Sequence, residues 1–184
     1  MKNLIFIFII LVSCKILAEN KHALLIGISE YTKKSGFQAT NAQADIKIMK
    51  NLFGQLGFRV HLLLDQQATK EGIKNAFLSF SHQCHRGDIA AIYYVGHGSA
   101  IADDDSPAEE FDNKDEAIVP YNAVRKNSKN YIRDDEIGEM INAVRKKLGP
   151  DGQLLFIAES CYSGTITRGQ NSLTIHRENE FLLD

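Results

Sequence analysis

The stretch AIYYVGHGSA, residues 91–100, ends an apolar run with a histidine between two glycines. Much later, LLFIAESCYSGT at residues 154–165 ends a second apolar run with a cysteine in a small, polar turn. Short aliphatic runs that close on turn residues are typical of buried strands. The two stretches therefore predict two strands whose carboxyl ends carry His97 and Cys161.

Two further strands are predicted nearer the start of the chain. Residues 22–28 read HALLIGI and residues 57–64 read GFRVHLLL, and both runs are short, aliphatic and bounded by turn residues. Such runs are typical of strands that are buried in a parallel sheet. Residues 89–95 and 153–158 supply the other two strands of the predicted sheet.

Three helices are expected between these strands, because apolar residues recur at three- and four-residue intervals. Thr69 is expected to cap the second helix, and Asp134 with Asp135 the third. Strands that alternate with helices predict an α/β fold with helices on both faces of a mostly parallel sheet. The periodic positions are Ala42, Asp45, Ile46, Met49, Leu52, Phe53 and Leu56, then Ile73, Ala76, Phe77 and Phe80, then Ile137, Met140, Ile141, Val144 and Leu148.

The composition fits one globular domain. The 184 residues are 44% hydrophobic and 24% charged, and the formal net charge of -2 gives no basic surplus for binding nucleic acid. Residues 1–20 resemble a signal peptide, because Lys2 precedes an apolar run and small residues lie near Ala18. We therefore expect export to the periplasm or the extracellular space, with residues 21–184 as the domain.

Two of the three cysteines invite alternative interpretations. Residues 11–14 also resemble a lipobox, in which case Cys14 would be lipidated and the protein would be held at a membrane. Cys84 ends an apolar helical face and is expected to be a buried thiol. His82, Cys84 and His85 form a tight group, but with no second ligand pair at finger spacing they do not predict a zinc site.

If the third and fourth predicted strands are neighbours in space, His97 and Cys161 can face the same pocket. In an open parallel sheet, functional groups gather at the carboxyl ends of the strands. A thiol beside an imidazole can become a nucleophilic thiolate, and the same histidine can protonate a departing amine. The backbone N–H groups of Gly98 and Cys161 could then form an oxyanion hole. The alternative is that His97 is a structural residue.

At this point the chain resembles the caspase fold, and more closely its metacaspase and bacterial caspase-like branch. The likeness runs from Lys21 to Arg168 through ALLIGIS, NAQADIKIM, YYVGHGS, DEAIVPYNA with RDDEI, and ESCYSGT. It implies a three-layer α/β/α sandwich and a cysteine peptidase with His97 and Cys161 as its dyad. It also implies that Asp45 and Glu159 bind an arginine or lysine before the scissile bond.

The resemblance carries two further implications. Several metacaspases bind calcium, and Asp115, Asp134 and Asp135 match three carboxylate positions, whereas Arg168 stands where a fourth aspartate is expected. No cofactor is otherwise required. The last two strands of the family fold are also missing, unless residues 170–184 start one, so the catalytic domain is interpreted as incomplete at its carboxyl end. A missing carboxyl-terminal or small-subunit partner would account for this.

The leading functional hypothesis is an endopeptidase that cuts peptides or proteins after arginine or lysine. It includes self-cleavage after Arg168 or Arg177. The alternative is a non-catalytic binding or scaffold module with a caspase fold, a truncated pseudo-peptidase. A thiol oxidoreductase is a third hypothesis, which the lack of a C-x-x-C motif disfavours.

Overall fold

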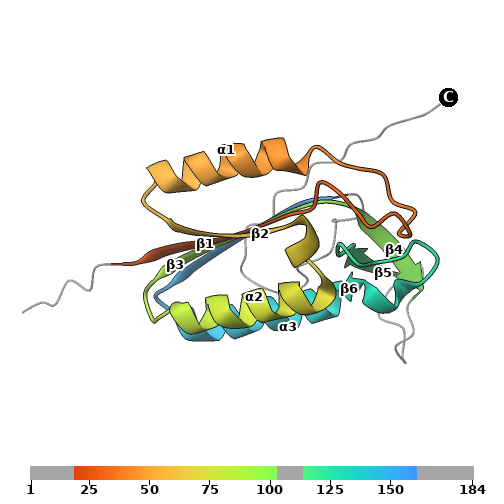
Figure 1. Cartoon of the computed structure of the whole chain (residues 1–184). Helices are drawn as coiled ribbons and strands as arrows, with labels where there is room; N and C mark the ends of the chain where they lie inside the picture. Colours follow the sequence, from red (N-terminus) through yellow and green to blue (C-terminus); the bar gives the residue numbers. More distant parts are fainter. Residues whose placement is uncertain (1–18, 103–113, 161–184) are drawn as a thin grey trace, which may run out of the picture.

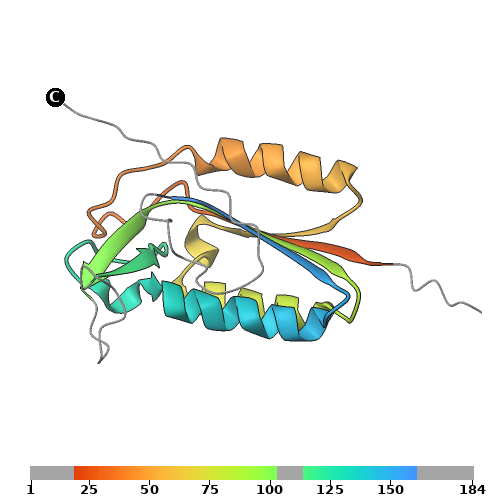
Figure 2. The same ribbon diagram turned by 180° about the vertical axis from the view of Figure 1, so that it is seen from behind.

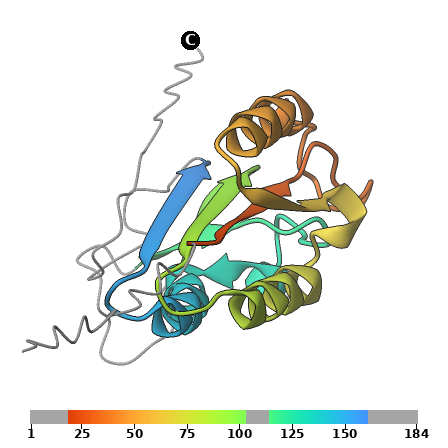
Figure 3. The same ribbon diagram turned by 90° about the vertical axis from the view of Figure 1, so that its left-hand side faces the viewer.

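The computed structural model describes residues 19–102 and 114–160 of the chain. Within them, four strands form a parallel sheet in the order β2-β1-β3-β7. One helix, α1, covers one face, while α2 and α3 cover the other (Figure 1, Figure 3). This confirms the predicted three-layer α/β/α fold. The strands are β1 (Lys21–Gly27), β2 (Arg59–Leu64), β3 (Ile89–Val95) and β7 (Gln153–Glu159), and the helices are α1 (Ala42–Gln55), α2 (Lys70–Gln83) and α3 (Asp134–Leu148).

A small antiparallel sheet lies at the carboxyl end of β3 (Figure 1, Figure 2). Its strands are β4 (Gly98–Ala102), β5 (Lys114–Ile118) and β6 (Ile132–Arg133), in the order β4-β5-β6. The sequence did not predict this sheet, because its strands are short and their apolar residues do not form a periodic run. Only Gly96 and His97 separate β3 from β4. The small sheet therefore begins directly beside the predicted catalytic histidine.

The central strand β3 is buried on both faces. Parallel strands between two helical layers read as continuous apolar runs, and successive side chains point to opposite layers. One set packs with residues of α2 and α3, and the other packs with residues of α1. Burial on both faces anchors β3, and with it the segment that leads to His97. The first set is Ala90, Ile92 and Tyr94, and the second is Ala91, Tyr93 and Val95.

The strand β2 differs from the expectation of a buried strand. Among the described strands it pairs with β1 alone and forms an outer edge of the sheet. Arg59 and Leu62 are exposed, and no residue of β2 is fully buried. Edge strands lack a neighbour on one side, so the helical layers cover them less completely. The prediction of a strand was right and the prediction of its burial was wrong.

Two predicted details of the helices were also wrong. Leu52 of α1 and Leu56, the C-cap residue that follows it, are 45% and 51% exposed, although both were expected in the periodic apolar face of the helix. Leu52 directly precedes the buried Phe53 and so lies about 100° around the helix from it, outside the stripe that meets the sheet. In α3 the N-cap is Arg133, and Asp134 already lies inside the helix.

The chain begins α3 straight from β6, which explains the shifted cap. The Arg133 backbone N–H donates to the Glu136 carboxylate at 3.2 Å, so the first turn supplies its own acceptor. Asp134 and Asp135 instead place negative charge in the first turn, where it is favourable to the helix dipole. By contrast, the predicted cap of α2 is confirmed: Thr69 Oγ1 accepts the Gly72 backbone N–H at 3.0 Å.

Several predictions fall outside the described residues. These are the lipobox and all but the last two residues of the signal peptide, in residues 1–18, and the chain from residue 161 onward, which includes Cys161, Arg168, Arg177 and any added strand. Within the described ranges, no helix combines the length and apolar character that crossing a membrane requires.

Candidate active site

The carboxyl ends of β3 and β7 lie side by side and level with one another. The two strands pair in parallel, with Val95 opposite Glu159, and the Gly96 N–H donates to the Glu159 carbonyl at 3.3 Å. His97 follows Val95 by two residues, and Cys161 follows Glu159 by two residues. The two strands are therefore neighbours, and their register ends both at the same edge of the sheet and at the same height.

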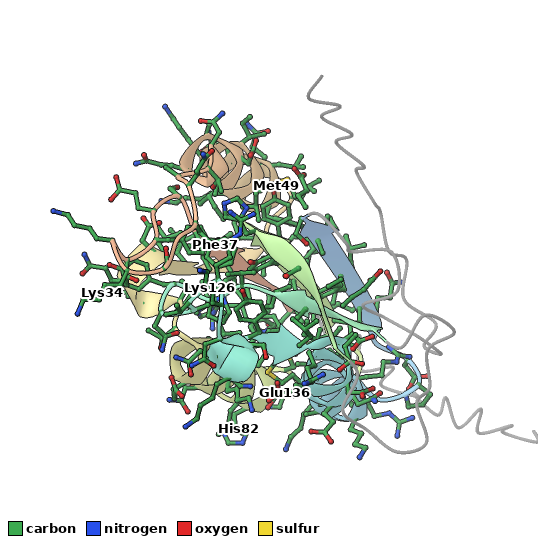
Figure 4. All side chains as sticks on the ribbon, turned by 90° about the vertical axis from the view of Figure 1, so that its right-hand side faces the viewer. Lys34, Phe37, Met49, His82, Lys126 and Glu136 are labelled. Atoms are coloured by element: carbon green, nitrogen blue, oxygen red, sulfur yellow. The ribbon has the colours of Figure 1, made fainter. Side chains whose placement is uncertain are left out.

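The His97 ring is held by a loop that the sequence analysis did not single out. This loop, residues 29–41, joins β1 to α1. Tyr31 and Phe37 lie against the imidazole with ring centroids 5.1 and 5.3 Å away. Figure 4 looks onto this end of the molecule, with Phe37 near the centre of the view and Lys34 farther out. His97 is therefore a packed side chain with a defined orientation.

A backbone carbonyl shows which ring nitrogen of His97 carries the proton. His97 Nε2 lies 2.9 Å from the carbonyl oxygen of Gln38. A carbonyl only accepts hydrogen bonds, so in this contact Nε2 carries the proton and donates it. In the neutral ring the other nitrogen, Nδ1, is then unprotonated and able to take a proton. The geometry suits a general base.

The backbone of His97 is fixed as firmly as its ring. Its N–H donates to Tyr31 Oη at 2.8 Å, and its carbonyl accepts from Tyr94 Oη at 2.8 Å and from the Val119 N–H at 3.0 Å. Burial raises the pKa of Tyr31 to about 12, so this hydroxyl stays neutral. A Cβ at Gly96 would come within 2.8 Å of Tyr94 Oη, which is why glycine precedes the histidine.

The N–H of Gly98 is not used by the neighbouring strand. Gly98 opens β4 and stands opposite Ile118 of β5. Because the Val119 N–H donates to the His97 carbonyl, the 97–119 pair is the hydrogen-bonded type and the next pair, 98–118, is the open type. In an open pair the N–H points away from the partner strand. The Gly98 N–H therefore points away from β5, as a donor of an oxyanion hole would have to.

The two predicted specificity carboxylates come from different elements at this same edge. Asp45 lies in the first turn of α1 and is partly exposed. Its neighbour Ile46 packs over Gly27, where an added Cβ would come within 2.4 Å of Ile46 Cγ1. Glu159 is the last residue of β7 and is partly buried. The amino end of α1 and the carboxyl end of β7 thus both reach the edge that carries His97.

The three predicted calcium ligands do not gather into a cation site. Asp115 is 5% exposed, and its carboxylate forms an ion pair with the Arg133 guanidinium. Asp134 and Asp135 form the first turn of α3, where the Asp135 N–H donates to Asp134 Oδ1 at 3.1 Å. Across residues 19–102 and 114–160, no group of three or more acidic, histidine or cysteine side chains could hold a metal ion. The described residues therefore do not fit calcium.

The cysteine near the end of α2 is structural. Cys84 is 2% exposed, and burial raises its pKa to about 11. Such a thiol is neither a nucleophile nor a metal ligand at neutral pH. Its neighbours His82 and His85 are exposed, and Figure 4 shows His82 pointing outward below α2. The predicted buried thiol is confirmed.

Sequence reasoning missed the residues that orient His97. Tyr31, Phe37 and Gln38 lie in EYTKKSGFQATN, residues 30–41, which has no periodicity. Gln38 acts through its backbone carbonyl, so its side chain gives no signal. An aromatic residue on each side of a glycine-containing loop, directly after a predicted strand, was the one available clue.

Comparisons with known proteins agree with this geometry. The sequence profile of the caspase domain matches residues 20–183. Metacaspase-6 of Arabidopsis thaliana is 29% identical over 157 aligned residues, and the match covers 78% of this chain and 38% of that protein. The crystal structure of a Geobacter sulfurreducens protein superposes with a TM-score of 0.62 at 25% identity, covering 80% of this chain and 52% of that one. The chain spans about half or less of the length of these relatives. It belongs to the caspase-domain family of cysteine peptidases.

Proposed function

We propose that this protein is a cysteine endopeptidase in which His97 and Cys161 form the catalytic dyad. The observation that carries the proposal is the pairing of Val95 with Glu159, which ends β3 and β7 at the same height. His97 and Cys161 each follow their strand by two residues. The Gln38 carbonyl adds support, because its contact with Nε2 leaves Nδ1 of His97 as the base. Peptides or proteins are the substrates that the family implies.

In the proposed reaction, Nδ1 of His97 takes the proton of the Cys161 thiol. The thiolate attacks the carbonyl carbon of the scissile peptide bond, and the N–H groups of Gly98 and Cys161 stabilise the oxyanion. His97 then gives its proton to the departing amine as the C–N bond breaks. Water hydrolyses the resulting thioester and restores the thiol. The chain would need no metal for any of these steps.

We also propose a preference for arginine or lysine before the scissile bond. Asp45 and Glu159 supply two carboxylates from α1 and β7 at the same edge. Two carboxylates attract a guanidinium or ammonium group and repel an acidic side chain. The proposal extends to self-cleavage after Arg168 or Arg177, and to export directed by residues 1–20.

A calcium requirement is not part of this proposal. The Arg133 guanidinium already pairs with the buried carboxylate of Asp115. A second cation at that carboxylate would have to displace or face the arginine, and both arrangements are unfavourable. The arginine thus supplies positive charge beside one of the three carboxylates that the resemblance assigned to calcium.

The second candidate function is a binding or scaffold module without catalysis. Its support is the position of β7, which among the described strands pairs with β3 alone and leaves one side of the sheet open. An open edge can accept a strand from another chain. This candidate makes a clear prediction, namely that Cys161 has no special reactivity.

Hydrolysis of matched fluorogenic peptides tests the proposal. One peptide carries arginine before the scissile bond and the other carries aspartate. We expect cleavage of the arginine peptide by the wild-type chain and none by Cys161→Ala, with Cys84→Ala as the matched control that keeps full activity. Equal turnover by Cys161→Ala would contradict the dyad, and preferred cleavage of the aspartate peptide would contradict the specificity.

A further inference from the structure

Asp65 holds an unusual backbone conformation at the end of β2. Its φ angle is +42°, and it is the one non-glycine residue with positive φ in the described part of the chain. Residues other than glycine adopt this region uncommonly, and such a conformation persists where the surroundings enforce it. Asp65 also begins the short 3₁₀ helix η1 (Asp65–Gln67).

The carboxylate of Asp65 binds the start of the loop that holds His97. One oxygen, Oδ1, accepts the N–H of Ser29 at 2.7 Å and the N–H of Glu30 at 3.1 Å. The two donors lie two and three residues after the end of β1, where the chain leaves the sheet. Without Asp65 these two N–H groups would need another acceptor. The strained backbone therefore aims one carboxylate oxygen at one short segment.

The next residue of that segment is Tyr31, whose hydroxyl accepts the His97 N–H and whose ring packs on the imidazole. The other end of the loop is closed separately, since the Thr40 N–H donates to the Ser29 carbonyl at 2.8 Å. Ser29 is thus tied to Asp65 through its N–H and to Thr40 through its carbonyl. A shift of Ser29 moves both ends of the loop at once, and Phe37 and Gln38 with them.

We propose that Asp65 is a positioning residue for His97, acting through its two hydrogen bonds to the start of loop 29–41. The inference rests on the proposed peptidase function, and it adds a residue that acts on His97 through the loop and not by direct contact. It predicts that loss of the acceptor oxygen loosens the Tyr31 and Gln38 contacts and misplaces the imidazole. Two substitutions separate the role of the acceptor oxygen from that of the backbone conformation, because glycine and asparagine both adopt positive φ but only asparagine keeps the oxygen.

The decisive pair of variants is Asp65→Gly and Asp65→Asn. Glycine adopts positive φ without strain but has no acceptor, whereas asparagine tolerates positive φ and keeps Oδ1. We expect Asp65→Gly to lose about 10- to 100-fold in kcat with little change in KM, because small misplacements of a catalytic group slow the chemical step. We expect Asp65→Asn to retain most of kcat.

Glu30→Ala is the matched control. Glu30 lines the same cavity of about 350 Å³ as Asp65, and its side chain is exposed. The variant removes one negative charge beside Asp65 but leaves both backbone N–H donors in place. We expect its kcat to match the wild type. A loss equal to that of Asp65→Gly would assign the effect to charge and would overturn the proposal.

A structural measurement keeps the test independent of peptidase activity. In NMR spectra of the wild-type chain we expect nuclear Overhauser effects between the His97 ring and the rings of Tyr31 and Phe37. They should weaken in Asp65→Gly and persist in Asp65→Asn, even if no peptide is cleaved. Unchanged contacts in Asp65→Gly, or equal losses in both variants, would overturn the proposal. If Asp65→Gly does not fold, Asp65→Asn decides alone. Loss of the ring contacts in the folded Asp65→Asn variant would then overturn the proposal.

Discussion

Two histidines occupy opposite edges of the same sheet, and their surroundings differ in kind. His97 follows the carboxyl end of β3, is partly exposed, and has one ring nitrogen committed to the Gln38 carbonyl. His22 lies at the amino end of β1, is 4% exposed, and has its Nε2 3.7 Å from the Asp88 carboxylate. The first is partly exposed and keeps Nδ1 as its unprotonated nitrogen. The second is enclosed in the core.

Asp88 organises the amino edge as a closed structural unit. It is 3% exposed, and its carboxylate accepts the N–H of Asn20 at 3.0 Å, the Asn20 amide at 3.1 Å and the N–H of His85 at 2.9 Å. These bonds tie the entry of β1 to the entry of β3. The comparison teaches that one sheet can use the same residue types for stability at one edge and for chemistry at the other.

The largest effect should come from His97→Ala. We expect kcat/KM for the arginine peptide to fall by about 10³-fold or more, because the variant removes both the base and the general acid. Stability should change little, since the histidine is partly exposed. His22→Gln serves as the comparison and should leave kcat/KM near the wild-type value. A large loss of activity in His22→Gln at neutral pH would erase the difference between the two edges.

The opposite pattern is expected at Asp88. Asp88→Ala leaves three donors without their acceptor and should lower the free energy of unfolding by about 2–4 kcal/mol in urea denaturation. Asp151→Ala is the control, because its exposed ion pair with Arg86 should contribute no more than about 1 kcal/mol. Equal effects of the two substitutions would show that the amino edge is not the stabilising unit described above.

A smaller effect concerns pH. Burial lowers the pKa of His22 from its ordinary value of 6.5, although the nearby Asp88 charge opposes this. As pH falls below that ordinary value, the unfolded chain takes up a proton that the folded chain refuses, so stability falls. His22→Gln should therefore make the dependence of unfolding free energy on pH shallower in this range. An unchanged slope would show that His22 is not the group responsible.

The smallest expected effect is that of a chelator. Because Arg133 neutralises the Asp115 carboxylate, activity of the wild-type chain should be the same in calcium and in chelator. Arg133→Gln keeps a hydrogen-bond donor for Asp115 but removes the charge, so any dependence on calcium should appear in that variant first. A wild-type chain that loses activity in chelator would contradict the proposed role of the arginine.

The sequence predicted the parts of the molecule that rest on periodic burial. The apolar runs that precede His97 and Cys161 predict strands, and the carboxyl ends of parallel strands lie at the same edge of a sheet. Periodicity located α1, α2 and α3 for the same reason. It overestimated the buried face of α1, because Leu52 lies outside the stripe that meets the sheet and Leu56 lies beyond the last residue of the helix.

The parts that sequence could not predict depend on backbone geometry. The Gln38 carbonyl orients His97, yet every residue has a carbonyl. The positive φ of Asp65 is set by its surroundings, and an aspartate after a strand reads simply as a turn residue. The N-cap of α3 was misplaced because β6 has only two residues and gives no pattern of its own. Local side-chain chemistry predicts elements well and their junctions poorly.

The measurement that tests the central claim most directly is the rate at which iodoacetamide alkylates each cysteine of the folded chain, read by mass spectrometry. The account predicts that Cys161 reacts faster than Cys84, whose pKa is raised to about 11 by burial. It also predicts that His97→Ala removes this advantage and that His22→Gln preserves it. Equal labelling of both cysteines, or a Cys161 rate that does not depend on His97, would contradict the dyad and favour the scaffold function.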